Sequence, residues 1–163
     1  MDEALAKARA LLENVTPLRF DCGRRCGAAC CSPDEDGKGG MLLFPGEETL
    51  YDPLPEGFSI RQDPIGLLLV CSGRCDRALR PLSCMLFPLW IFEKEQGFAV
   101  RTDPRARGVC PLSHCGLGAL SSEFIAAVRG AGELLLREEK HRRFLRETAG
   151  VIGQFSADTL FRV

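Results

Sequence analysis

Nine cysteines, four of them close together near the start of the chain, constrain this sequence more than any other feature. The first group has the pattern C-x3-C-x3-C-C, the second C-x3-C-x8-C and the third C-x4-C. The residues are Cys22, Cys26, Cys30 and Cys31, then Cys71, Cys75 and Cys84, then Cys110 and Cys115. Cysteines clustered in this way, in a chain whose thiols stay reduced, favour metal binding or redox chemistry.

The remaining sequence favours a reduced state for these thiols. The first residues lack the basic and apolar regions of a secretory signal, and no stretch approaches the roughly 18 apolar residues of a membrane span. We therefore expect a cytoplasmic protein with no membrane partner. A chain of 163 residues can bury a core without disulfides, and an odd cysteine count argues against complete pairing.

The charge of the chain gives no strong indication of a nucleic-acid partner. The formal net charge is −1, so the protein has no large field of one sign to attract nucleic acid or an anionic membrane. The basic clusters Arg101–Arg107 and Lys140–Arg143 are interpreted as solvated faces.

Hydrophobic periodicity predicts helices at both ends of the chain. Apolar residues recur at helical spacing from Asp2 to Asn14, before Pro17. Two further helices are expected over 121–129 and 133–148, separated by the glycines of 130–132, with Gly150 ending the second.

Short alternating segments predict two β-hairpins between these helices. One joins 58–61 to 67–70 through the turn signal Asp63–Gly66, and it would deliver Cys71 at its end. The other joins 89–92 to 98–101, with Trp90 expected in the core.

The spacing within the first cysteine group argues against one continuous helix. Such a helix would place Cys22 and Cys30 about 12 Å apart along its axis. That distance is too long for one tetrahedral ion with Zn–S bonds of about 2.3 Å. With Gly23 and Gly27 each following a cysteine, we expect a loop or broken helix around the metal.

The thiolates are soft ligands that suit zinc, an iron–sulfur cluster or copper(I). Four are enough for one zinc ion or one [4Fe–4S] cluster, and nine could supply two sites. Cys30 and Cys31 would both ligate with two sites or a cluster; otherwise one is a small buried hydrophobe. The best candidates are Cys22, Cys26, Cys30 or Cys31, Cys71, Cys75 and Cys84, followed by Cys110 and Cys115. His114 is a weaker candidate than its neighbour Cys115.

A third chemistry is dithiol redox work by Cys30 and Cys31. It would need an accessible thiolate with a lowered pKa, and the lack of a C-x-x-C motif argues against it.

The cysteines and their surroundings resemble a known family. Five parts of the sequence are similar to the YkgJ-type cysteine-cluster family. They are the first cysteine group, the segment Leu43-Phe44-Pro45-Gly46-Glu47-Glu48, the pair Cys71 and Cys75, the segment Arg80-Pro81-Leu82-Ser83-Cys84, and Phe87-Pro88. This family is also called the CxxCxxCC putative zinc- or iron-chelating domain. The resemblance covers about residues 20–90. It implies metal chelation. A similar cysteine set in bacterial flagellin lysine methylases implies that some members carry an iron–sulfur cluster linked to methyl transfer.

The sequence thus predicts a single small α+β domain over residues 1–163, with short β-hairpins and helices around a cysteine-lined metal site. The expected function is chelation of zinc or iron, as a mononuclear site or an iron–sulfur cluster. The alternative is an iron–sulfur enzyme, or enzyme subunit, that supports electron or methyl transfer. A metal ion is the only partner indicated, and the sequence singles out no catalytic residue and no nucleotide-binding motif.

Overall fold

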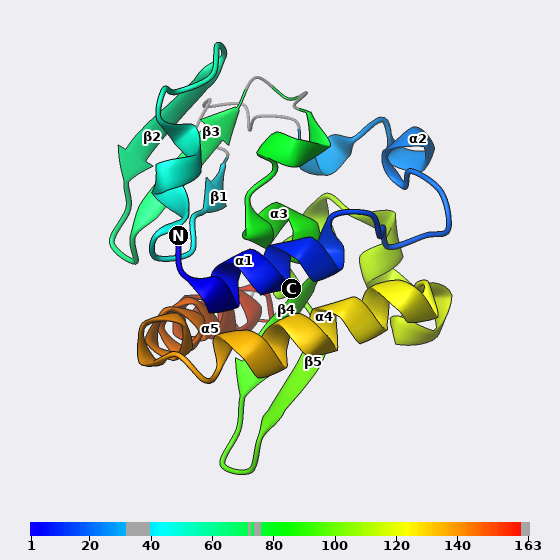
Figure 1. Ribbon diagram of the computed structural model, residues 1–163. Helices are drawn as coiled ribbons and strands as arrows, with labels where there is room; N and C mark the ends of the chain where they lie inside the picture. Colours follow the sequence, from blue (N-terminus) through cyan, green and yellow to red (C-terminus); the bar gives the residue numbers. More distant parts are fainter. Residues whose placement is uncertain (32–39, 72, 74–75, 161–163) are drawn as a thin grey trace.

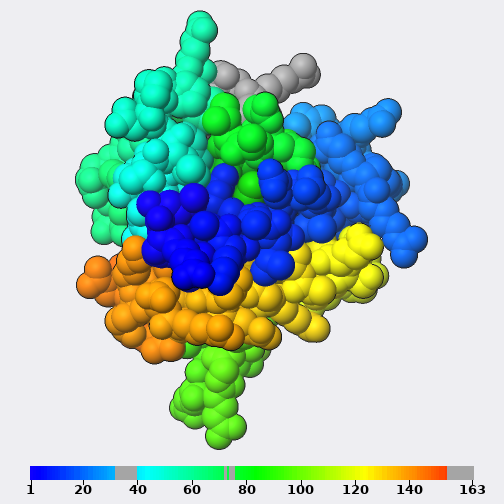
Figure 2. Space-filling model, viewed as in Figure 1, coloured from blue at the N-terminus to red at the C-terminus, as the bar shows by residue number. Residues whose placement is uncertain are grey.

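The N-terminal helix α1 (Glu3–Leu12) packs one face against the main core. The computed structural model describes residues 1–31, 40–71, 73 and 76–160, with the side chains of the last helix described as far as Gly153. Asp2 caps α1 by accepting a 2.8 Å hydrogen bond from the Leu5 N–H group, and Leu5, Ala8 and Leu12 are buried. The helix predicted from apolar spacing is confirmed. Figure 2 shows α1 crossing one face of the molecule, between the small sheet and the C-terminal helices.

Two antiparallel sheets complete the α+β architecture, as expected. The first has the order β1-β3-β2, and the second is the β4–β5 hairpin, which extends away from the helices (Figure 1). Both predicted hairpins are confirmed, and Cys71 lies at the end of β3, opposite Phe58. The strands are β1 (Met41–Leu42), β2 (Phe58–Gln62), β3 (Leu67–Cys71), β4 (Leu89–Glu93) and β5 (Phe98–Thr102).

Short helical turns connect the sheets, and Cys26, Cys30, Cys31 and Cys84 lie within them. The α-helical turns are α2 (Gly23–Cys26) and α3 (Leu82–Leu86). The 3-10 turns are η1 (Ala29–Cys31), η2 (Glu47–Tyr51), η3 (Arg77–Leu79), η4 (Pro104–Gly108), η5 (Pro111–His114) and η6 (Leu117–Ala119).

The main hydrophobic core lies between α1, α3, β4 and the C-terminal helices α4 (Ser122–Leu135) and α5 (Glu139–Leu160). Trp90 is 1% exposed, so its predicted place in the core is confirmed. Phe44 packs 4.6 Å from Phe144 and 6.0 Å from Trp90, measured between ring centroids. These aromatic contacts, with the Trp90 and Phe144 rings 6.4 Å apart, pack β4 against α5.

The predicted boundary between the two C-terminal helices was wrong. Helix α4 continues through Gly130 and Gly132, and α5 continues past Gly150. A Cβ atom at Gly132 would lie 2.7 Å from the Phe98 ring, and one at Gly130 would lie 3.1 Å from Leu11. Gly132 and Gly130 therefore allow α4 to pack closely against β5 and α1, and they do not end a helix.

Replacement of Gly132 by valine should lower the free energy of unfolding by about 1–3 kcal/mol, because the new side chain must displace Phe98. Gly150→Val is the matched control, since a Cβ there meets no atom within 4 Å; we expect a change of less than about 0.5 kcal/mol. Urea denaturation of both variants measures the difference. Equal stabilities would contradict the close packing of α4.

The charge pattern predicts that the basic cluster at the start of α5 is a solvated face. This prediction is wrong for part of the cluster. His141 is fully buried, and its Nε2 lies 2.9 Å from Asp2 Oδ2. Lys140 Nζ lies 2.6 Å from the same carboxylate. Burial raises the pKa of Asp2, but hydrogen bonds from Lys140, the Leu5 N–H group and His141 outweigh it and leave the pKa below its ordinary value. The cluster thus ties α5 to the start of α1.

None of the helices in the described part of the chain combines the length and the apolar composition that a membrane crossing requires.

Candidate metal centre

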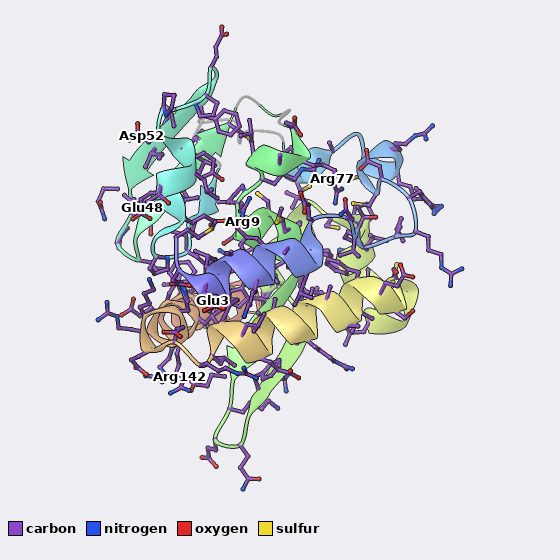
Figure 3. All side chains as sticks on the ribbon, viewed as in Figure 1. Glu3, Arg9, Glu48, Asp52, Arg77 and Arg142 are labelled. Carbon is purple, nitrogen blue, oxygen red and sulfur yellow. The ribbon has the colours of Figure 1, made fainter. Side chains whose placement is uncertain are left out.

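One cavity of about 420 Å³ collects the cysteines of the fold. All eight described cysteines line it, and the ninth, Cys75, lies outside the described residues. The cysteines are Cys22, Cys26, Cys30, Cys31, Cys71, Cys84, Cys110 and Cys115. In Figure 3 sulfur atoms gather between α3 and the segment that carries α2, near the labelled Arg77. Residues far apart in sequence therefore share one thiol-lined space.

The later cysteines are placed by regular elements. Cys71 ends β3, and Cys84 lies within α3, a helical turn that the sequence had not indicated. Cys110 and Cys115 stand immediately before and after η5. The last two, ranked lower on sequence, thus face the same cavity as the others.

The first cysteines lie on a broken helix, as their spacing predicts. Helix α2 ends at Cys26 and is capped by Gly27, which has a φ of 62°, and Ala28 follows with a φ of 58°. Glycine adopts this left-handed conformation readily, whereas an alanine there is uncommon. The turn reverses the chain, so that η1 brings Cys30 and Cys31 to the cavity wall.

The pKa values of the adjacent cysteines Cys30 and Cys31 are shifted in opposite directions. The pKa of Cys31 falls to about 6, mainly because the Cys30 thiol donates a hydrogen bond to its sulfur, while the nearby charge of Arg80 outweighs that of Asp21. The same hydrogen bond, together with burial, raises the pKa of Cys30. The hydrogen bond from Cys30 therefore favours the thiolate form of Cys31, which metal ligation and thiol redox chemistry both require.

The other cavity thiols influence one another. Burial raises the pKa of Cys22, and the charges of Asp21, Cys110 and Cys26 raise it further. Burial also raises the pKa of Cys110, with Cys26 and Cys115 contributing. Several thiolates cannot accumulate here without a compensating positive charge.

The thiols line the cavity without converging on a point. Cys26 Sγ lies 3.9 Å from the Cys22 carbonyl oxygen, and Cys115 Sγ lies 3.6 Å from that of Pro111. Among the described residues, no three His, Cys, Asp or Glu side chains are grouped as a metal would require. The thiol groups suit a soft metal by their chemistry. Ligation of one metal would require their sulfur atoms to move inward.

Histidine and arginine occupy contrasting positions at this site. His114 does not line the cavity; its Nε2 lies 3.0 Å from the Arg107 carbonyl oxygen. Arg25, Arg77 and Arg80 do line it, and no Asp or Glu stands among the described lining residues. Sequence reasoning did not single out these arginines as site residues, although Arg25 directly precedes Cys26 and Arg80 lies four residues before Cys84, because spacing alone does not show which charged side chains face a cavity.

Comparison of the chain with protein-family models, with curated proteins and with solved structures returns no match. The resemblance to the YkgJ-type family rests on the quoted motifs and stays a prediction.

Proposed function

We propose that this protein binds zinc or iron through cysteine thiolates that line the cavity. The observation that carries the proposal is the presence of all eight described cysteines around one cavity. A set of unligated core thiols would not need to share a single space. Thiolates are suited to zinc and to iron–sulfur clusters, and the lowered pKa of Cys31 favours the ionised form that ligation requires.

The number of thiols favours more than one mononuclear ion. One tetrahedral site uses four thiolates, and twice that number line a single cavity. A polynuclear cluster or two neighbouring ions would use the surplus. Cys30 and Cys31 could then both ligate, as the sequence left open.

Metal binding would draw the wall of the cavity inward. The segment that carries α2 and η1 has no buried residue in either turn, so little packing opposes its movement. Cys71, Cys84 and Cys110 lie beside better packed elements and would form the fixed side. Ligation of both sides links distant segments, and metal binding thereby contributes to folding stability.

A second candidate function is an iron–sulfur enzyme or enzyme subunit that supports electron or methyl transfer. The observation that favours it is the size of the cavity together with apolar side chains in its wall, among them Met41, Phe58 and Leu69. Such a wall could hold a substrate beside a cluster. The resemblance to flagellin lysine methylases points the same way.

Analysis of zinc, iron and acid-labile sulfide in protein purified without oxygen, with a visible spectrum, tests the proposal. Iron with sulfide and broad visible absorption would establish a cluster and favour the second candidate. Colourless protein with stoichiometric zinc would establish chelation. Absence of both metals, with nine titratable thiols, would refute metal binding and leave dithiol chemistry at Cys30 and Cys31 as the next hypothesis.

A further inference from the structure

A buried ion pair fixes the stretch of chain that leads to Cys84. Arg9 on α1 donates from Nη1 to the Arg80 carbonyl oxygen at 2.9 Å and from Nη2 to that of Ala78 at 3.3 Å. Arg9 also pairs with Glu47, whose Oε1 accepts the Leu82 N–H group at 2.7 Å. Two elements thus hold the backbone on both sides of Pro81.

Burial of this ion pair costs free energy, which points to a role in positioning the backbone around Pro81. Glu47 is fully buried, and the Arg9 side chain is 11% exposed. Burial raises the pKa of Glu47, opposed by the charge of Arg9 and by hydrogen bonds from Leu82 and Phe44. Buried pairs of this kind add little net stability, and here the hydrogen bonds of the pair hold the backbone of Arg80 and Leu82.

The residue held in place by this pair is Arg80. Its half-buried, positively charged side chain lines the same cavity as Cys22, Cys31 and the other described cysteines. Arg77 lines the same cavity, but its Nη2 donates to the carbonyl oxygens of Glu13 at 3.1 Å and Val15 at 3.0 Å. Arg77 therefore secures the chain that follows α1, and it provides a matched comparison for Arg80.

We propose that Arg80 is the fixed counter-cation of the metal–thiolate centre, and that the Arg9–Glu47 pair is the device that positions it. The inference rests on the proposed function. A centre with four thiolates carries net negative charge, because those charges exceed the two positive charges of a zinc ion. In a partly buried cavity without a described carboxylate, a nearby guanidinium stabilises that charge.

Zinc affinity, measured by competition with a chromophoric chelator, tests this role in Arg80→Met, Arg80→Lys and Arg77→Met. We expect about a tenfold loss for Arg80→Met, because a charge-assisted interaction is lost. Lysine should restore most of the affinity, since it keeps the charge. Arg77→Met should lower stability without a comparable loss of affinity.

A second measurement on the reduced, metal-free proteins reads the local field directly. The measured quantity is the rate of thiol alkylation by anionic iodoacetate divided by the rate with neutral iodoacetamide. The positive charge of Arg80 should raise this ratio, so the ratio should fall in Arg80→Met and not in Arg77→Met. A purely structural role would change both rates together. If the wild type binds zinc while Arg80→Met keeps its affinity and rate ratio, this inference alone is refuted. If the wild type binds neither zinc nor iron, the proposed function fails and the counter-cation role fails with it.

Discussion

Replacement of Cys84 by serine is expected to lower metal content and thermal stability together. Structural zinc sites bind with about 10–16 kcal/mol, so one of four thiolates accounts for about 3 kcal/mol, or a hundredfold in affinity. Cys84 lies on α3, on the better packed side of the cavity, where its thiolate would link α3 to the segment that carries α2. The metal content of purified protein and its melting temperature, with and without a chelator, measure both effects.

His114→Ala is the control for this variant. Its ring lies outside the cavity, so metal content should stay at the wild-type level. In the metal-free state Cys84→Ser should differ from the wild type by no more than about 1 kcal/mol, because the residue is half-buried and serine is similar in size. An unchanged metal stoichiometry and melting temperature in Cys84→Ser would rule out Cys84 as a ligand.

Glu47→Gln should lower the free energy of unfolding by about 3–5 kcal/mol, because it leaves the charge of Arg9 buried without its partner. Glutamine keeps the volume of the side chain and one oxygen that can accept the Leu82 N–H group, but its NH2 group cannot accept the Phe44 N–H group that Glu47 Oε2 accepts at 3.1 Å. The loss would therefore report the missing charge together with one lost hydrogen bond. Denaturation by urea, with metal content held constant, gives the measurement.

The double variant Arg9→Met/Glu47→Gln separates the missing charge from lost packing. Removal of both charges should recover part of the stability lost in Glu47→Gln, since no uncompensated charge stays buried. A double variant whose loss equals the sum of the two single losses would show that the pair is not coupled. The proposed positioning of Arg80 would then lose its physical basis.

Features that depend on local sequence were predictable. The apolar spacing before Pro17 specified α1, and the alternating segments specified both hairpins, including the delivery of Cys71 at the end of β3. The cysteine spacing with Gly27 specified the break after α2. These features follow from backbone preferences and periodicity, which neighbouring residues largely determine.

Other features were decided by packing between distant residues. Gly130 and Gly132 looked like a helix boundary, but contacts with Leu11 and Phe98 make them a close-packing surface within α4. Glu47 is buried because Arg9 and the Leu82 N–H group, both distant in sequence, bind its carboxylate, and no local pattern indicates this burial.

The sequence by itself determined which residues could bind a metal, because thiolate chemistry belongs to the cysteine side chain wherever it lies. Only the tertiary structure decided that Cys22, Cys71, Cys84 and Cys110 share one cavity, and that Arg80 stands beside them. The physical reason is that local spacing determines neither the direction in which separate elements pack nor the burial that shifts the pKa of a side chain. Both depend on contacts made across the whole fold.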